Sequence, residues 1–176
     1  HLLSLVNDVL DMSKIESGSM KLLNNPFDLR VLLQACCDIV EGQIIERNLT
    51  FTKQIGPFWH PYLVGSELHV RQVLINILSN AVKYTDRGRV SIRVTSAPAI
   101  IVADTGIGIA PEDVPRVFEK GYTGYNGRGG QKSTGLGLYL VHQTAEMLHC
   151  RVSLSSRIGE GTSVTIDLHQ EELGKE

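Results

Sequence analysis

Residues 71–85 read RQVLINILSNAVKYT, and their pattern predicts a helix at the centre of the fold. Apolar side chains recur at the spacing of one buried helical stripe, which comprises Val70, Val73, Leu74, Ile77, Leu78 and Ala81. Asn76 and Asn80 lie one turn apart on the opposite face, together with Gln72 and Lys83. Asn in a helix interior costs about half a kcal/mol relative to Ala, because its side chain competes for backbone hydrogen bonds. The pair therefore either marks a ligand site or consists of two ordinary solvated amides.

The composition is that of an ordinary globular domain, with 176 residues, 42% hydrophobic and 20% charged residues and a net charge of −2. The absence of a basic excess argues against a nucleic-acid surface. The three cysteines suit a reducing compartment, and no Cys/His pair has metal-ligand spacing. Because no apolar run approaches the roughly 18 residues of a membrane span, we expect a cytoplasmic domain without membrane contact of its own. The chain starts inside a helical pattern, so we expect a piece of a longer protein whose parent can be membrane-anchored.

The remaining pattern predicts alternating helices and strands. We expect a helix that Gly18 ends, and a second helix that Asp28 caps. Ser66 is expected to cap the asparagine helix. The other predicted elements are strands at 49–55, 62–65, 88–96 and 99–104, with a tight connection at 97–98, a short helical stretch after Pro111, a helix from about Gly135 to Leu148, and a hairpin that turns at 158–161. This order predicts an α/β fold, a two-layer sandwich with a mixed sheet covered by helices on one face.

A first glycine cluster, DTGIGI at 104–109, directly follows the apolar strand AIIVA. Asp104 could accept a hydrogen bond from an exocyclic amine, while Gly106 and Gly108 leave room for a flat ring. The alternative is a plain loop with a capping Asp.

A second cluster, STGLGL at 133–138, opens a predicted helix whose free N–H groups would form an anion site. The stretch 121–135 before it holds six of the 17 glycines, with Arg128 and Lys132, and is either a flap that closes over an anionic ligand or a plain flexible loop. Neither a P-loop nor a GxGxxG motif is present.

In this order the motifs resemble the ATP-binding catalytic domain of sensor histidine kinases, in the family shared with gyrase, Hsp90 and MutL (the Bergerat-type ATP-binding fold). Over residues 60–168, NILSNAVKYT, VADTGIGI, VFEKGY and STGLGLYLV look like the asparagine, first glycine, phenylalanine and second glycine boxes. The N-terminal LVNDVLDMSKIESGSMKL resembles the second helix of a dimerisation and phosphoacceptor domain with its linker. We therefore expect this helix and its linker over 1–22, the ATP-binding domain over 23–170 and a disordered tail over 171–176.

The resemblance also assigns roles to residues. It implies that Asn76 coordinates Mg²⁺, which prefers oxygen ligands, and that Asn80 contacts the metal–phosphate assembly. Asp104 would accept a hydrogen bond from the adenine amino group. The other implied nucleotide-binding residues are Lys83 and Tyr84 on the asparagine helix, Gly106 and Gly108 beside the adenine, and Lys132, Ser133, Thr134, Gly135, Leu136, Gly137 and Leu138 around the phosphates.

The function implied is that of a protein-histidine kinase, which binds Mg·ATP and transfers the γ-phosphoryl group to a histidine on the phosphoacceptor helix of its own parent chain. That parent would be a homodimer, and the phosphoryl group would pass on to the receiver domain of a response regulator. The acceptor motif, His followed by an acid and a Thr-Pro turn, is absent from residues 1–176, so we expect no autophosphorylation and assign no catalytic residue. Ser66 and His69 also depart from the family pattern, which more often has Asp and Arg there.

Three alternatives stay open on the same fold. An ATP-gated module of the gyrase, Hsp90 or MutL kind would use a carboxylate on the asparagine helix, where this chain has Gln72 and Asn76 before Asn80. An anti-sigma-type serine kinase would normally lack the N-terminal helix. A degenerate binding domain, kept for dimer contacts, would not need intact motifs.

Overall fold

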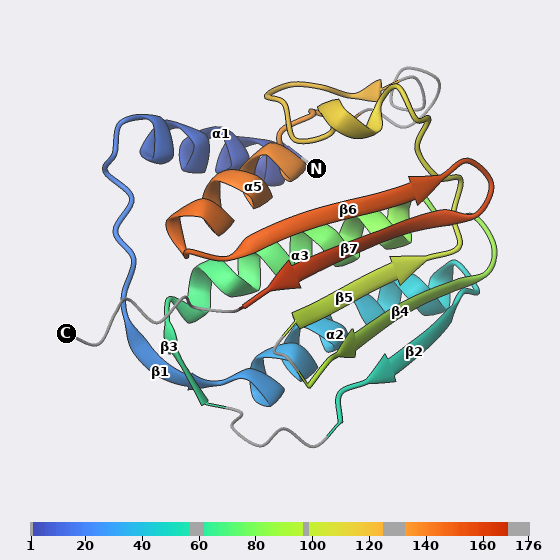
Figure 1. Cartoon of the computed structure of the whole chain (residues 1–176), viewed down its shortest axis with the longest axis horizontal. Helices are drawn as coiled ribbons and strands as arrows, with labels where there is room; N and C mark the ends of the chain where they lie inside the picture. The colour runs from blue at the N-terminus through green and yellow to red at the C-terminus, as the bar shows by residue number, and fades with distance from the viewer. Residues whose placement is uncertain (1, 57–61, 97–98, 125–132, 169–176) are drawn as a thin grey trace.

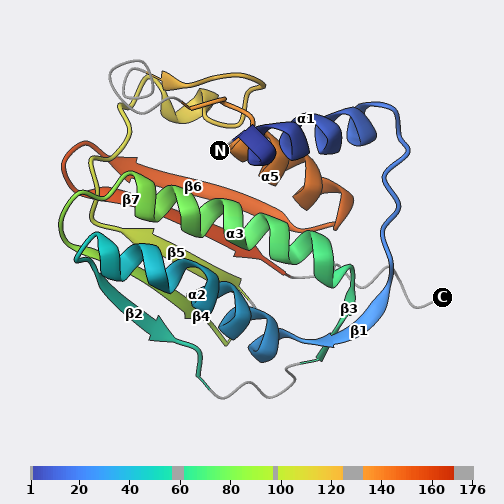
Figure 2. The ribbon, with the colours of Figure 1, turned by 180° about the vertical axis from the view of Figure 1, so that it is seen from behind.

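The computed structural model describes residues 2–56, 62–96, 99–124 and 133–168. A five-stranded mixed sheet forms one layer, and helices cover one of its faces (Figures 1 and 2). The sheet order is β2-β4-β5-β7-β6, with β2 parallel to β4 and the other neighbours antiparallel. The strands are β2 (Thr50–Gln54), β4 (Arg89–Val94), β5 (Ala99–Asp104), β6 (Arg151–Arg157) and β7 (Gly161–Asp167). The predicted α/β fold, with helices on one face of a mixed sheet, is confirmed.

The core lies between the sheet and the helices α2 (Leu29–Glu46) and α3 (Glu67–Lys83). Because side chains alternate along a strand, each central strand sends every second residue into this layer. The buried strand residues are Val90, Ile92, Ile100, Val102, Val164 and Ile166. The predicted stripe of α3 is buried as a whole, so its apolar spacing is explained by packing against the sheet.

Asp28 caps α2 as predicted, since its carboxylate accepts hydrogen bonds from the backbone N–H groups of Arg30 at 2.8 Å and Val31 at 3.4 Å. Ser66 does occupy the first position before α3, but the expected side-chain cap is wrong. The Ser66 hydroxyl lies 2.6 Å from Nδ1 of the buried His69 instead. These two departures from the family pattern therefore contact each other.

Two elements differ from the sequence-based prediction. The helix after the second glycine cluster, α5 (Gly137–Met147), begins two residues later than expected, because Gly135 has a left-handed φ of 68° that no helix continues. The stretch after Pro111 forms only the 3₁₀ turn η1 (Val114–Arg116), since Pro115 lacks the N–H that a longer helix would use.

The short strand β1 (Asn25–Asp28) has no counterpart in the prediction. It pairs antiparallel with β3 (Tyr62–Gly65) in a separate two-stranded sheet. A four-residue strand that contains Pro26 carries little local signal, because proline is depleted in strands and cannot donate to a ladder.

Helix α1 (Leu2–Glu16) packs alongside α5 on the helical side of the molecule (Figure 2). Gly18, with a φ of 66°, follows its last turn as predicted. None of its residues is buried, but Leu5, Met12 and Ile15 are half-buried, and two polar contacts join it to the rest of the fold. Gln72 of α3 donates to Asp11 at 3.4 Å, and Lys120 forms an ion pair with Glu16 at 2.5 Å. The predicted 97–98 connection and the tail at 171–176 lie outside the described residues.

Candidate functional site

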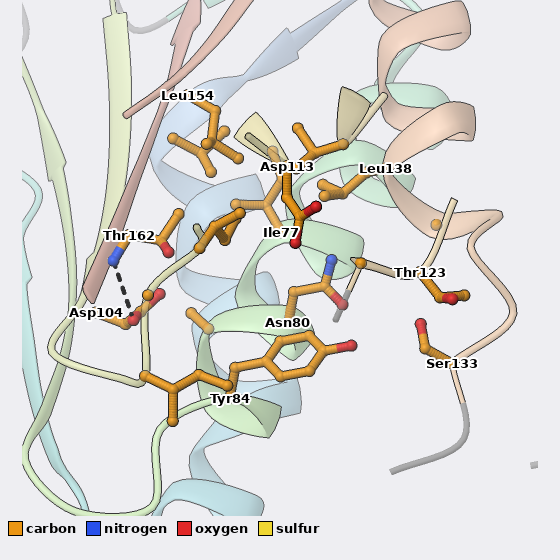
Figure 3. A pocket seen from close by; sticks show the side chains of 18 of the residues that line it. Ile77, Asn80, Tyr84, Asp104, Asp113, Thr123, Ser133, Leu138, Leu154 and Thr162 are labelled. Carbon is orange, nitrogen blue, oxygen red and sulfur yellow. Dashed lines mark hydrogen bonds between the residues drawn. The ribbon is translucent and has the colours of Figure 1, made fainter. Parts of the chain in front are cut away.

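A cavity opens between the C-terminal half of α3, the end of β5, the β6–β7 sheet and the segments that flank α5 (Figure 3). Most of its walls are apolar, with a few polar groups between them, which is the usual character of a small-molecule site. The described residues that line it are Ile77, Asn80, Ala81, Tyr84, Val102, Asp104, Ile107, Gly108, Ile109, Asp113, Val117, Tyr122, Thr123, Gly124, Ser133, Gly135, Gly137, Leu138, Leu154, Thr162 and Val164.

Asp104 is the polar group at the sheet side of the cavity. Burial raises the pKa of its carboxyl above the usual 3.8, while hydrogen bonds from the backbone N–H groups of Gly106 at 2.8 Å and Thr162 at 3.3 Å act in the opposite direction. Both donors hold the same oxygen, Oδ1, so the carboxylate has a fixed orientation; Figure 3 shows the bond from Thr162. A fixed acceptor among apolar walls is suited to a ligand that presents an amine.

The two glycines after Asp104 allow close approach of protein backbone. A Cβ on Gly106 would lie 2.3 Å from the carbonyl oxygen of Tyr84, at the end of α3. A Cβ on Gly108 would lie 1.9 Å from the carbonyl oxygen of Arg157, in the β6–β7 hairpin. Gly108 also lines the cavity, whereas Gly106 does not. Glycine is therefore needed at both positions for the turn to fit between α3 and the hairpin, whatever room it also leaves for a ligand.

The asparagine helix contributes Asn80 and the apolar Ile77 and Ala81 to the cavity, and Tyr84, directly after the helix, lines it as well. Asn76 and Lys83, which the sequence also proposed, are half-buried on α3 and do not line the cavity described here. The ammonium group of Lys83 lies 5.1 Å from the centroid of the Tyr84 ring, within cation–π distance. The structure thus brings one of the two asparagines directly to the cavity wall.

The second glycine cluster forms the opposite wall through Ser133, Gly135, Gly137 and Leu138. Thr134 and Leu136 do not line the cavity, and the Thr134 hydroxyl accepts the Leu136 N–H at 3.3 Å. Since α5 begins at Gly137, its first N–H groups lie at this wall, where they and the helix dipole favour an anion. Lys132 and the predicted flap over 125–132 lie outside the described residues.

Several lining residues were not predicted from the sequence. Tyr122 belongs to the quoted VFEKGY motif, which could have suggested it. Asp113 and Thr162 had no such signal, because one lies in an irregular segment and the other reaches the cavity only through the pairing of β7 with β5. Apolar residues such as Ile109 and Leu154 read equally well as ordinary core residues.

The described residues hold no group of three or more His, Cys, Asp or Glu side chains that could bind a metal by themselves. The neutral amide of Asn80 is nevertheless an oxygen donor that Mg²⁺ accepts. Such a site fits a magnesium ion that takes most of its other ligands from phosphates and water.

Residues 65–172 match the family model described as histidine kinase-, DNA gyrase B-, and HSP90-like ATPase. The chain belongs to this family. Among curated proteins, the histidine protein kinase DivJ of Caulobacter vibrioides is 36% identical over 96% of this chain and 29% of its own length. The sensor protein GacS of Pseudomonas syringae pv. syringae is 35% identical over 96% of this chain and 20% of its own length. The crystal structure of full-length ShkA in complex with AMPPNP superposes with a TM-score of 0.82 at 28% identity, over 94% of this chain and 35% of that chain.

These similarities cover at least 94% of the chain, and DivJ is a histidine protein kinase. The chain is thus an ATP-binding catalytic domain of the sensor histidine kinase type, as its motifs predicted. It spans less than a third of the length of these two kinases. Across the described residues, no helix has both the length and the apolar content to cross a membrane.

Proposed function

We propose that this chain binds Mg·ATP in the cavity and donates the γ-phosphoryl group to a histidine on the phosphoacceptor helix of its parent protein. From there the phosphoryl group passes to the receiver domain of a response regulator. The observation that carries the proposal is the placement of Asp104, Asn80 and the first turn of α5 around one cavity. An amine acceptor, an amide oxygen and an anion site match the three parts of a metal–nucleotide complex.

The arrangement orients the nucleotide. Asp104 accepts a hydrogen bond from the adenine amino group, and Tyr84 borders the base. The N–H groups near Gly137, with the hydroxyl of Ser133, face the phosphates from the opposite wall. Lys83 adds positive charge one turn beyond Asn80, and Lys132 is assigned to the phosphates by resemblance alone.

Asn80 and Asn76 would hold the magnesium ion through their amide oxygens, without adding negative charge beside a triphosphate. When bound, the ion neutralises charge that develops on the phosphoryl oxygens during transfer. Enzymes of phosphoryl transfer act mostly by positioning and charge stabilisation, so this domain needs to supply only the bound nucleotide. The α3 residues that line the cavity include no carboxylate, which favours a kinase over a water-activating ATPase of the gyrase kind.

The experiment that tests this function is a calorimetric titration of Mg·ADP into the wild-type chain and into Asp104→Asn. We expect binding by the wild type and a loss of at least about tenfold in affinity for the variant, because a charge-assisted hydrogen bond contributes about 1.5–3 kcal/mol. Asp86→Asn is the matched control, because Asp86 is an exposed carboxylate just after α3 and does not line the cavity. EDTA should weaken binding by the wild type. Absence of binding by a folded wild-type chain would overturn the proposal.

A further inference from the structure

Asp113 is a second carboxylate in the cavity, and the proposed nucleotide contacts leave it without a role. It lies directly before η1, and its Oδ1 accepts a hydrogen bond from the hydroxyl of Tyr122. A Cβ on Gly124 would lie 3.2 Å from its Oδ2. Both carboxylate oxygens therefore lie against the segment 122–124, whose three residues line the same cavity.

The Tyr122 ring is also held from another direction. The guanidinium carbon of Arg116 lies 4.3 Å from the centroid of the ring, and Arg116 forms an ion pair with Glu119 at 3.0 Å. One residue earlier, the N–H of Gly121 donates to the carbonyl of Gly135 at 3.0 Å, which joins the segment to the second glycine cluster. Gly121 and Tyr122 thus connect η1 to the second glycine cluster, which directly precedes α5.

A carboxylate beside a site for a triphosphate would repel the ligand unless its charge were engaged. In this fold its Oδ1 accepts the Tyr122 hydroxyl, and Arg116, whose ion pair is with Glu119, contributes a weaker attraction. In return, the carboxylate holds the segment 122–124, in which Tyr122 and Thr123 lie in no helix or strand. Asp113 is consequently placed to hold residues 122–124 in position, whereas Asp104 is placed to accept a hydrogen bond from the base.

We propose that Asp113 is a positioning residue whose hydrogen bond to Tyr122 holds residues 122–124 as a preformed wall of the nucleotide cavity and thereby slows nucleotide release. The inference rests on the proposed function, since it assumes that the cavity binds nucleotide. When the wall is already ordered, binding does not cost the entropy of ordering residues 122–124. Loss of the Asp113–Tyr122 hydrogen bond should therefore raise the dissociation rate of the nucleotide.

The test is stopped-flow binding of a fluorescent Mg·ADP analogue to the wild type, Asp113→Ala, Tyr122→Phe and the double variant. The nucleotide should dissociate from each single variant about tenfold faster, because each variant lacks one charge-assisted hydrogen bond. The association rate should change little. The double variant should be no worse than either single one, because both remove the same interaction. Asp113→Asn keeps an oxygen acceptor and should restore most of what Asp113→Ala loses. Tyr122→Phe removes a single oxygen atom, so it tests the hydrogen bond even if Asp113→Ala unfolds the chain.

Glu112→Ala is the matched control, because its exposed carboxylate lies one residue away and outside the cavity. Additive single effects, or Asp113→Asn as severe as Asp113→Ala, would overturn the inference. Unchanged dissociation in Asp113→Ala, while Asp104→Asn loses binding, would overturn it and leave the proposed function intact. Failure of the folded wild type to bind the analogue would overturn both.

Discussion

Gly108 illustrates at the scale of one residue how the site and the fold depend on the same atoms. Its φ is 71°, and the place of its missing Cβ is taken by the backbone of Arg157. The N–H of Gly159 in the same hairpin donates to Ile107 at 2.9 Å. A side chain here would separate the turn after β5 from the hairpin whose strand donates to Asp104.

We therefore expect Gly108→Ala to lower the free energy of unfolding by about 1–3 kcal/mol, the usual cost of a strained backbone position. Urea denaturation followed by circular dichroism measures this. The control is Gly42→Ala, since Gly42 is exposed in the interior of α2 with open space at its Cβ position. That change should raise the free energy of unfolding by about 0.5–1 kcal/mol, because alanine favours a helix. Equal effects at the two positions would contradict the role given to Gly108.

At the scale of one element, α1 differs from the other helices. It contributes no buried residue, and large apolar side chains remain exposed, namely Leu2, Leu3, Val6, Val9 and Leu10. From the resemblance to a dimerisation helix we expect this surface to meet the same helix of a second copy. Such a partner is consistent with the size of the exposed apolar stripe, since soluble monomers rarely leave one open.

We expect weak self-association of the wild-type chain, which the double substitution Val6→Glu, Leu10→Glu should abolish. Sedimentation velocity over a concentration series measures it. Ser4→Glu adds a charge to an exposed polar position of the same helix and serves as the control. The free energy of unfolding should change little in either variant, because no residue of α1 is buried. A monomeric wild type at all concentrations would contradict the expectation.

At the scale of the whole molecule, the cavity exists only because distant segments meet. α3 supplies the amide, β5 the carboxylate, β7 its backbone donor and α5 the anion site. β5 and β7 are neighbours in the sheet, α3 and α5 cover it, and the four meet at the end of the sheet where β5 stops (Figures 1 and 3). The arrangement binds and orients a nucleotide, and the acceptor histidine is a separate requirement.

We therefore expect residues 1–176 to bind ATP without becoming phosphorylated. Incubation with radiolabelled ATP should leave this chain unlabelled, whereas a phosphoacceptor domain of its parent, supplied in trans, should acquire label. Asp104→Asn should reduce that transfer in proportion to its loss of nucleotide affinity. Label on the isolated chain would show that one of its own side chains accepts the phosphoryl group.

Much of this architecture could be predicted from local signals. The Asp28 cap, the stop at Gly18, the buried stripe of α3 and the hairpin at 158–161 each depend on residues within a few positions of one another. The amides and the two glycine clusters also stood out, because each is locally unfavourable without a compensating role. These features predicted the fold class, and their resemblance to a known family implied the kind of ligand.

Other features depended on contacts between distant segments and were decided only by the tertiary structure. β1 exists because β3 pairs with it, and Thr162 reaches Asp104 because β7 lies beside β5. Likewise, Asn80 rather than Asn76 lines the cavity. Asp113 lines it beside Tyr122, whose hydroxyl donates to the Asp113 carboxylate. The sequence by itself determined most of the elements and the side chains that they carry, since hydrophobic period and backbone preference are local. Which side chains share the cavity was left to packing, because that depends on the register of strands and the rotation of helices against the sheet.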